Sequence, residues 1–171
     1  RNSPCDALEG SAEASIVEQL RQCCQHGERA WARDIGTRAT LADTAEEMQH
    51  CPAIYLVYDG YMVAEADVQR AALIHRWLAI VAVANAVQGR EAAPRNQDAG
   101  PLVGDVFRAL HGFMPAGSVE AMVPATPPRP FYSPAKFAYF PVAFTTVAHH
   151  DTRSGVATAG AHVKHVPYPY P

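Results

Sequence analysis

The segment PAIYLVYDGYMVAEADVQRAALIHRWLAIVAVAN, residues 52–85, decides the fold. It begins with an apolar strand predicted at Ala53–Tyr58 and, after an Asp-Gly pair, continues into an unusually long strand. The first half of the long strand, from Arg70 to Arg76, mixes charged and apolar residues. Its second half, Leu78–Ala84, is continuously apolar, which is typical of a strand covered on both faces. We therefore expect a mid-sheet strand with helices packed against it and a first half that projects beyond the core.

The Asp59-Gly60 pair admits two interpretations. It is a common signal for a tight type I′ hairpin, which would add a strand at Tyr61–Ala64. Alternatively, residues 60–68 form a longer loop before the long strand. The two interpretations differ by one strand, and the sequence leaves both open.

An amphipathic helix is predicted before this segment, at Ala12–His26. Its apolar residues recur at i, i+1, i+4, i+7 and i+8, which places them on one face. Ser15 and Glu18 have the spacing of a capping box, with Ser11 as an alternative N-cap. Gly27 is expected to end the helix as its C′ residue. Such a helix covers one face of a sheet.

A second helix is predicted at Ala99–His111, with Asp98 as N-cap, Pro101 in its first turn and Gly112 at its end. The remaining elements are weaker. They are an extended segment at 28–39, a short acidic helix at 41–48, a short strand at 119–124, a proline-rich loop at 124–134 and a closing strand at 136–149. Trp31 and Ile35 of the extended segment are expected to turn inward. Pro141 donates no ladder hydrogen bond, so the closing strand is expected to be an edge strand or to be bulged at this residue.

The predicted fold class is α/β in the α+β sense, a mixed and mostly antiparallel sheet with two main helices on it. The chain has 171 residues, of which 49% are hydrophobic. A compact domain of this size buries roughly 70% of its unfolded surface. We expect one domain at 1–150 and an extended C-terminal arm at 151–171, which ends in Pro-Tyr-Pro-Tyr-Pro and lacks core periodicity.

Charge is distributed unevenly along the chain. The formal net charge is −3. Residues 1–70 hold 6 Arg and 12 Asp or Glu, a net of −6, whereas residues 71–171 hold 8 Lys or Arg and 5 Asp or Glu, a net of +3. The balance gives no general case for nucleic-acid binding, while the asymmetry suits contacts between copies of the chain.

Cysteine spacing and hydropathy predict an intracellular, non-membrane protein. The four cysteines have no disulfide-framework spacing, and adjacent Cys23 and Cys24 on a helix cannot easily pair. The sequence has no signal peptide and no apolar run of 18 or more residues.

No motif in the sequence indicates an enzyme, and we predict no cofactor and no metal. There is no P-loop, no dinucleotide fingerprint and no nucleophile elbow. His149-His150-Asp151 and the pair His162 and His165 invite a metal hypothesis, but neither set is expected to share one face. Ordinary surface histidines are the preferred interpretation. His75 lacks a partner nearby in the sequence.

Interface residues are expected where the chain has surface to spare: the polar end of the long strand, the 86–100 loop, the proline-rich loop and the tail. Aromatic side chains and arginines dominate protein interfaces. The candidates are Arg70, Arg76, Arg95, Tyr132, Tyr168 and Tyr170.

The order of these elements, with the segments PAIYLVYDG at 52–60, HRWLAIVAVAN at 75–85, LVGDVFRALHGF at 102–113 and KFAYFPVAFTT at 136–146, resembles the tail terminator family of long-tailed bacteriophages. In particular it is similar to the minor tail, or tail completion, proteins of Mu-like phages. The resemblance covers Ser11–Val147 and carries no catalytic signature.

The resemblance implies a structural virion protein in the tail-neck region, assembled in the host cytoplasm. Six copies would form a ring on the last ring of tail tube protein, stop polymerisation and meet the head-tail connector protein. A sheath protein is a possible further partner, and DNA would only pass through the lumen. The alternatives are a head-completion or connector protein and a small cytosolic metal- or ligand-binding enzyme.

Overall fold

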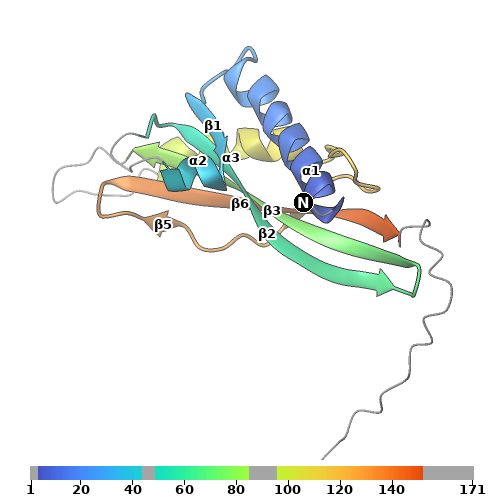
Figure 1. Ribbon diagram of the computed structural model, residues 1–171. Helices are drawn as coiled ribbons and strands as arrows, with labels where there is room; N and C mark the ends of the chain where they lie inside the picture. Colours follow the sequence, from blue (N-terminus) through green and yellow to red (C-terminus); the bar gives the residue numbers. More distant parts are fainter. Residues whose placement is uncertain (1–3, 44–48, 85–95, 152–171) are drawn as a thin grey trace, which may run out of the picture.

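The computed structural model describes residues 4–43, 49–84 and 96–151 and shows a six-stranded mixed sheet with helices packed on it (Figure 1). The strand order is β1-β2-β3-β6-β4, and β5 pairs with β6 beside this path. Only β1 and β2 are parallel; the other pairs are antiparallel. This confirms the predicted α+β class. The strands are β1 Asp34–Thr37, β2 Ala53–Ala66, β3 Arg70–Ala84, β4 Val123–Ala125, β5 Phe131–Tyr132 and β6 Phe137–Asp151.

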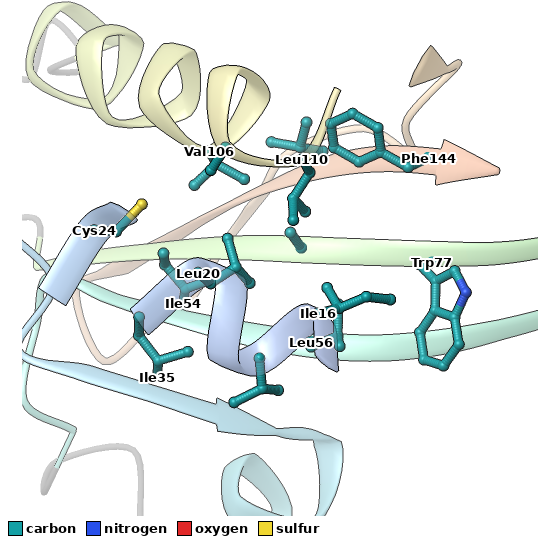
Figure 2. Close-up of a cluster of buried hydrophobic side chains, with 14 of the residues drawn as sticks. Ile16, Leu20, Cys24, Ile35, Ile54, Leu56, Trp77, Val106, Leu110 and Phe144 are labelled. Carbon is teal, nitrogen blue, oxygen red and sulfur yellow. The ribbon is translucent and has the colours of Figure 1, made fainter. Parts of the chain in front are cut away.

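Two helices cover one face of the sheet, α1 (Pro4–Leu20, continued by the π-helical turn η1, Arg21–Gln25) and α3 (Asn96–Leu110). Their apolar side chains meet those of β2, β3 and β6 in the main core (Figure 2). Its largest fully buried members include Trp77, Phe144, Ile16, Leu20 and Leu110. Apolar burial of this kind stabilises by roughly 1.5–3 kcal/mol per large side chain.

The opposite face is covered only in part. The short helix α2 (Arg38–Asp43) lies there, and Leu41 packs near the buried side chains of Ala53, Tyr55 and Ala82. Burial raises the pKa of the Tyr55 hydroxyl to about 12. The prediction that β3 is central is confirmed, because β2 and β6 flank it. The cover on both faces that was expected for Leu78–Ala84 holds at Leu78 and Ala82, whereas Ile80 on the same face is partly exposed.

The first helix begins and ends differently from the prediction. It starts at Pro4, so Ser11 and Ser15 lie inside it and the predicted capping box is wrong. The Ser15 hydroxyl instead donates to the Ala12 carbonyl (2.9 Å) and accepts from the Ala116 N–H (3.0 Å), which ties the helix to a distant loop. Gly27 does not adopt the left-handed conformation of a C′ glycine; the π turn ends the helix.

Both interpretations of Asp59-Gly60 are wrong. β2 runs through this pair to Ala66, and its register against β3 shifts between Tyr58 and Tyr61, so that two residues oppose Arg76. This is a β-bulge, and Gly60 has a φ of 94°, which favours glycine. The hairpin turn lies at Asp67, whose carboxylate accepts from the N–H groups of Gln69 and Arg70 at 2.6 and 2.7 Å.

The C-terminal elements follow the prediction with three corrections. Helix α3 begins at Asn96, so Asp98 is inside it and not its N-cap. The segment predicted as a proline-rich loop contains the two-residue strand β5 and the end of β4. Pro141 is neither in an edge strand nor at a bulge toward β3, since it pairs in regular register with Ile80. On the other side of β6, Pro141 lies between the stretches that pair with β5 and with β4, so none of the described strands there needs its missing N–H.

Two substitutions in β2 should separate the core from the projecting part of the sheet. Leu56 is fully buried and Met62 is 59% exposed. We expect Leu56→Ala to lower the free energy of unfolding by roughly 2–5 kcal/mol, because it leaves a cavity in the core. Met62→Ala should change it by less than about 0.5 kcal/mol. Urea denaturation followed by circular dichroism measures both, and equal losses would contradict the assignment of the core.

Candidate interface surface

The sheet extends past the helices as a three-stranded wing, which we define as residues 61–74 of the β2–β3 hairpin and residues 147–151 of β6 (Figure 1). Within the wing Met62 pairs with Ile74, and Ile74 pairs with Val147. The wing is the predicted projection of β3 beyond the core, and β2 and β6 accompany it on either side.

The β2 strand of the wing exposes apolar side chains. Tyr61, Met62 and Val63 are 58%, 59% and 60% exposed, and Val68 at the hairpin tip is 91% exposed. Tyr61 and Val63 lie on one face of the sheet and Met62 on the other, so both faces of this strand expose apolar surface of the kind that is enriched where proteins associate. These side chains were not among the predicted interface residues, because the stretch was expected to be either the second strand of a tight hairpin or a loop; the consecutive Tyr-Met-Val run was the signal.

The same stretch is an edge strand. β1 pairs with β2 only as far as Leu56, so from Tyr61 to Ala66 the outer side of β2 meets no strand in the parts of the chain that the structure describes. Proteins normally protect long edges with lysine, proline or a covering segment. Here the only charged residue between Tyr61 and Ala66 is Glu65. An apolar, unprotected edge is suited to pairing with a strand of another molecule.

Two of the predicted arginines, Arg70 and Arg76, lie on the wing and at its base, on the face opposite α1 and α3. Arg70 forms an ion pair with Asp151 (2.8 Å), and this hydrogen bond lowers the pKa of the Asp151 carboxyl. Arg76 pairs with Asp59 of the bulge (2.9 Å) and donates to the Thr126 carbonyl (2.7 Å). Both guanidinium groups therefore form hydrogen bonds within their own chain. A partner molecule at an interface would be bound by the N–H groups that these hydrogen bonds leave over.

Tyr132 lies elsewhere. It belongs to β5, where it pairs with Ala138 and its ring meets Phe140 edge-on. Arg70 pairs with Asp151, at the opposite end of β6. The structure thus brings Arg70 and Arg76 to one end of the sheet and Tyr132 to the other. Arg95, Tyr168 and Tyr170 fall outside the described residues, and the role of all six at an interface stays a prediction.

A cluster of aromatic polar side chains lies at the base of the wing. His75 is buried, its Nδ1 lies 2.9 Å from the Tyr58 hydroxyl, and its Nε2 lies 3.3 Å from Nε2 of His150. The ring of Tyr61 also approaches His75. Sequence reasoning missed this cluster, since it depends on the register of three strands and on the bulge that turns Tyr61 toward His75.

The chain matches a family model described as phage tail terminator protein, over residues 12–154. No curated protein matches it. The match confirms the family that the sequence resembles, whereas the Mu-like type stays a prediction. In the part of the chain that the structure describes, no helix is long and apolar enough to cross a membrane.

The His75 cluster predicts a pH-dependent stability. Burial, and then the positive charge of His150, lower the pKa of His75 below its ordinary value of 6.5. The unfolded chain therefore binds the proton more readily, and the stability contributed by neutral His75 is lost as the pH falls below about 6.5. We expect urea midpoints to drop between about pH 7.5 and 5.5. His75→Gln should flatten this dependence and His149→Gln should not; an identical slope in all three proteins would contradict the assignment.

Proposed function

Because the chain belongs to the phage tail terminator family, and is thus a structural protein of the phage tail, we propose that its copies form a ring that caps the tail tube. The ring stops tube polymerisation and joins the tail to the head connector in the neck of the virion. The proposed ring is a hexamer of the Mu-like type, built from the domain at 1–150, with the segment at 151–171 as an arm that contacts a neighbour.

The exposed edge of β2 is the observation that supports the ring most directly. β2 and β6 both run antiparallel to β3, so they run in the same direction and form the two sides of the wing. Among the described residues, the outer side of β6 pairs with β4 only at 143–145, and Val119 adds one hydrogen bond to the Val147 carbonyl. The β2 edge of one copy can therefore lie against the β6 edge of the next as a parallel strand pair. Such a head-to-tail contact repeats around an axis, and it closes into a ring when the rotation from one copy to the next divides a full turn evenly.

A terminator needs two different partner surfaces. A tube of stacked rings grows because each added ring exposes the same face, so the cap must match that face and present another. Arg70 pairs with Asp151 at one end of β6, and Tyr132 pairs with Ala138 at the other. Along an extended strand, Asp151 and Ala138 are roughly 40 Å apart. Their separation suits contacts with the tube protein at one end and the connector protein at the other. Shape and charge complementarity give the specificity that this role requires.

Without this protein, tails should still assemble, but their length should no longer be controlled. We expect that phage in which the gene is deleted produce tails of uncontrolled length and heads without tails, because nothing blocks the growing end of the tube. Electron microscopy of lysates measures both. Purified protein added to deletion tails should appear as a ring at one end only. Normal tails joined to heads in the deletion strain would overturn the proposal, and protein that co-purifies with heads alone would favour a connector protein.

The edge contact can be tested with a matched pair of substitutions. Val63 in the wing and Val123 in β4 are 60% and 51% exposed, so neither contributes much to the core. We expect Val63→Lys to weaken ring formation at least tenfold, about 1.4 kcal/mol per contact, because a lysine would lie at each β2 edge. Val123→Lys should assemble normally. Light scattering and negative-stain imaging measure the ring fraction. Rings that form equally well with both variants would show that this edge is not the contact.

A further inference from the structure

The histidine pair at the base of the wing has the geometry of a metal-binding pair. His75 on β3 and His150 on β6 lie on one face of the sheet, and their Nε2 atoms approach to 3.3 Å. In the strand register Ala148 stands between them, opposite Leu73. Its small side chain leaves room for the two rings to lean toward each other.

Two imidazole nitrogens at this distance are joined in one of two ways: one Nε2 carries a proton and donates it to the other, or both lone pairs face a bound cation. Their lone pairs repel unless they share a proton or an ion. Two nitrogens bound to a tetrahedral metal ion at 2.0–2.1 Å lie about 3.3–3.4 Å apart. The observed separation of 3.3 Å suits either arrangement.

The second nitrogen of His75 supports the metal arrangement. Nδ1 lies 2.9 Å from the Tyr58 hydroxyl oxygen. When Nδ1 carries the proton and donates it to this oxygen, Nε2 presents its lone pair toward His150. Metal-binding histidines usually have such an acceptor on their other nitrogen, which fixes the tautomer and the ring orientation.

A small cavity adjoins the pair. It has a volume of about 20 Å³ and is lined by His75, His150, Trp77, Ser118 and Thr146, among others. A cavity of this volume accommodates about one water molecule. The buried indole N–H of Trp77 has no hydrogen-bond partner among the described residues. A water bound to an ion at the histidine pair could accept from this N–H.

We propose that His75 and His150 form a two-histidine site for a divalent transition-metal ion of borderline softness, such as Zn²⁺ or Cu²⁺, whose remaining ligands are solvent. Imidazole suits these ions. In the described part of the chain, no three His, Cys, Asp or Glu side chains gather in one place, so the site offers two protein ligands. The ion links β3 to β6 where the wing leaves the core. The proposal does not depend on ring formation.

Calorimetric titration of the full chain with Zn²⁺, with any affinity tag removed, tests the site. We expect one equivalent to bind above pH 7 and to weaken at lower pH, because both imidazoles must be neutral. His150→Ala should weaken this binding at least tenfold. His149→Ala is the matched control, since its side chain projects from the opposite face of β6, and it should bind as the unchanged chain does. A double His162→Ala, His165→Ala variant controls for histidines outside the described residues.

Cu²⁺ and electron paramagnetic resonance give a second readout that does not depend on affinity. Hyperfine structure from two equivalent nitrogens is expected in the unchanged chain, and from fewer in His150→Ala. His75→Gln keeps a polar group beside Tyr58 and should lose the same signal if it folds. The proposal is overturned if the chain binds no Zn²⁺ at sub-millimolar concentration, if His150→Ala binds as well as His149→Ala, or if only the His162, His165 variant loses the ion.

Discussion

The pairing of β3 with a long strand on each side is the constraint on which the rest of the structure depends. β3 is paired from Arg70 to Ala84 with β6, and over most of that length with β2. Half of this three-stranded ribbon carries the apolar face on which α1 and α3 pack, and the other half extends past the described helices. These strands are longer than the part of the sheet on which the helices pack. The extra length forms the wing, its exposed edge and the histidine cluster at its base. A sheet whose strands ended where the helices end would have none of these features.

The β-bulge at Asp59-Gly60 has two effects on this ribbon: it changes which face of the sheet the next side chains lie on, and it brings Asp59 to Arg76. It adds one residue to β2 and so reverses which side chains lie on each face of the sheet from Tyr61 to Val63, where a second register shift follows. Tyr61 and Val63 consequently lie on the same face as His75, while Met62 lies on the face of Arg76. The bulge also places the Asp59 carboxylate beside the Arg76 guanidinium. An exposed pair of this kind contributes little to stability, but it fixes the orientation of a side chain at the base of the wing.

Local patterns in the sequence were sufficient to predict the core, and insufficient to predict the surface. The apolar run at Leu78–Ala84 and the stripes of the two helices are recorded in consecutive residues, so the central strand, the covering helices and the α+β class could be predicted. Asp59-Gly60 is locally a turn signal, and the tertiary pairing of β2 with β3 overrode it. The Ser15 hydroxyl likewise has the spacing of a cap, yet its partner is a backbone N–H about one hundred residues away. The proximity of His75 to His150 could not be predicted, since it depends on the register between two strands, β3 and β6, that lie far apart in the sequence with α3, β4 and β5 between them.

The position of Pro141 has a consequence for how the sheet moves. β5 pairs with β6 on one side of this proline and β4 on the other, so the outer hydrogen bonds of β6 form two separate ladders. Disruption of one ladder therefore does not propagate along β6 into the other. The turn at Lys136, with its positive φ, closes the β5 hairpin independently of the rest. We therefore expect the amide protons of the β5 hairpin to exchange through local opening, and those of the buried part of β3, from Trp77 to Ala82, to exchange far more slowly.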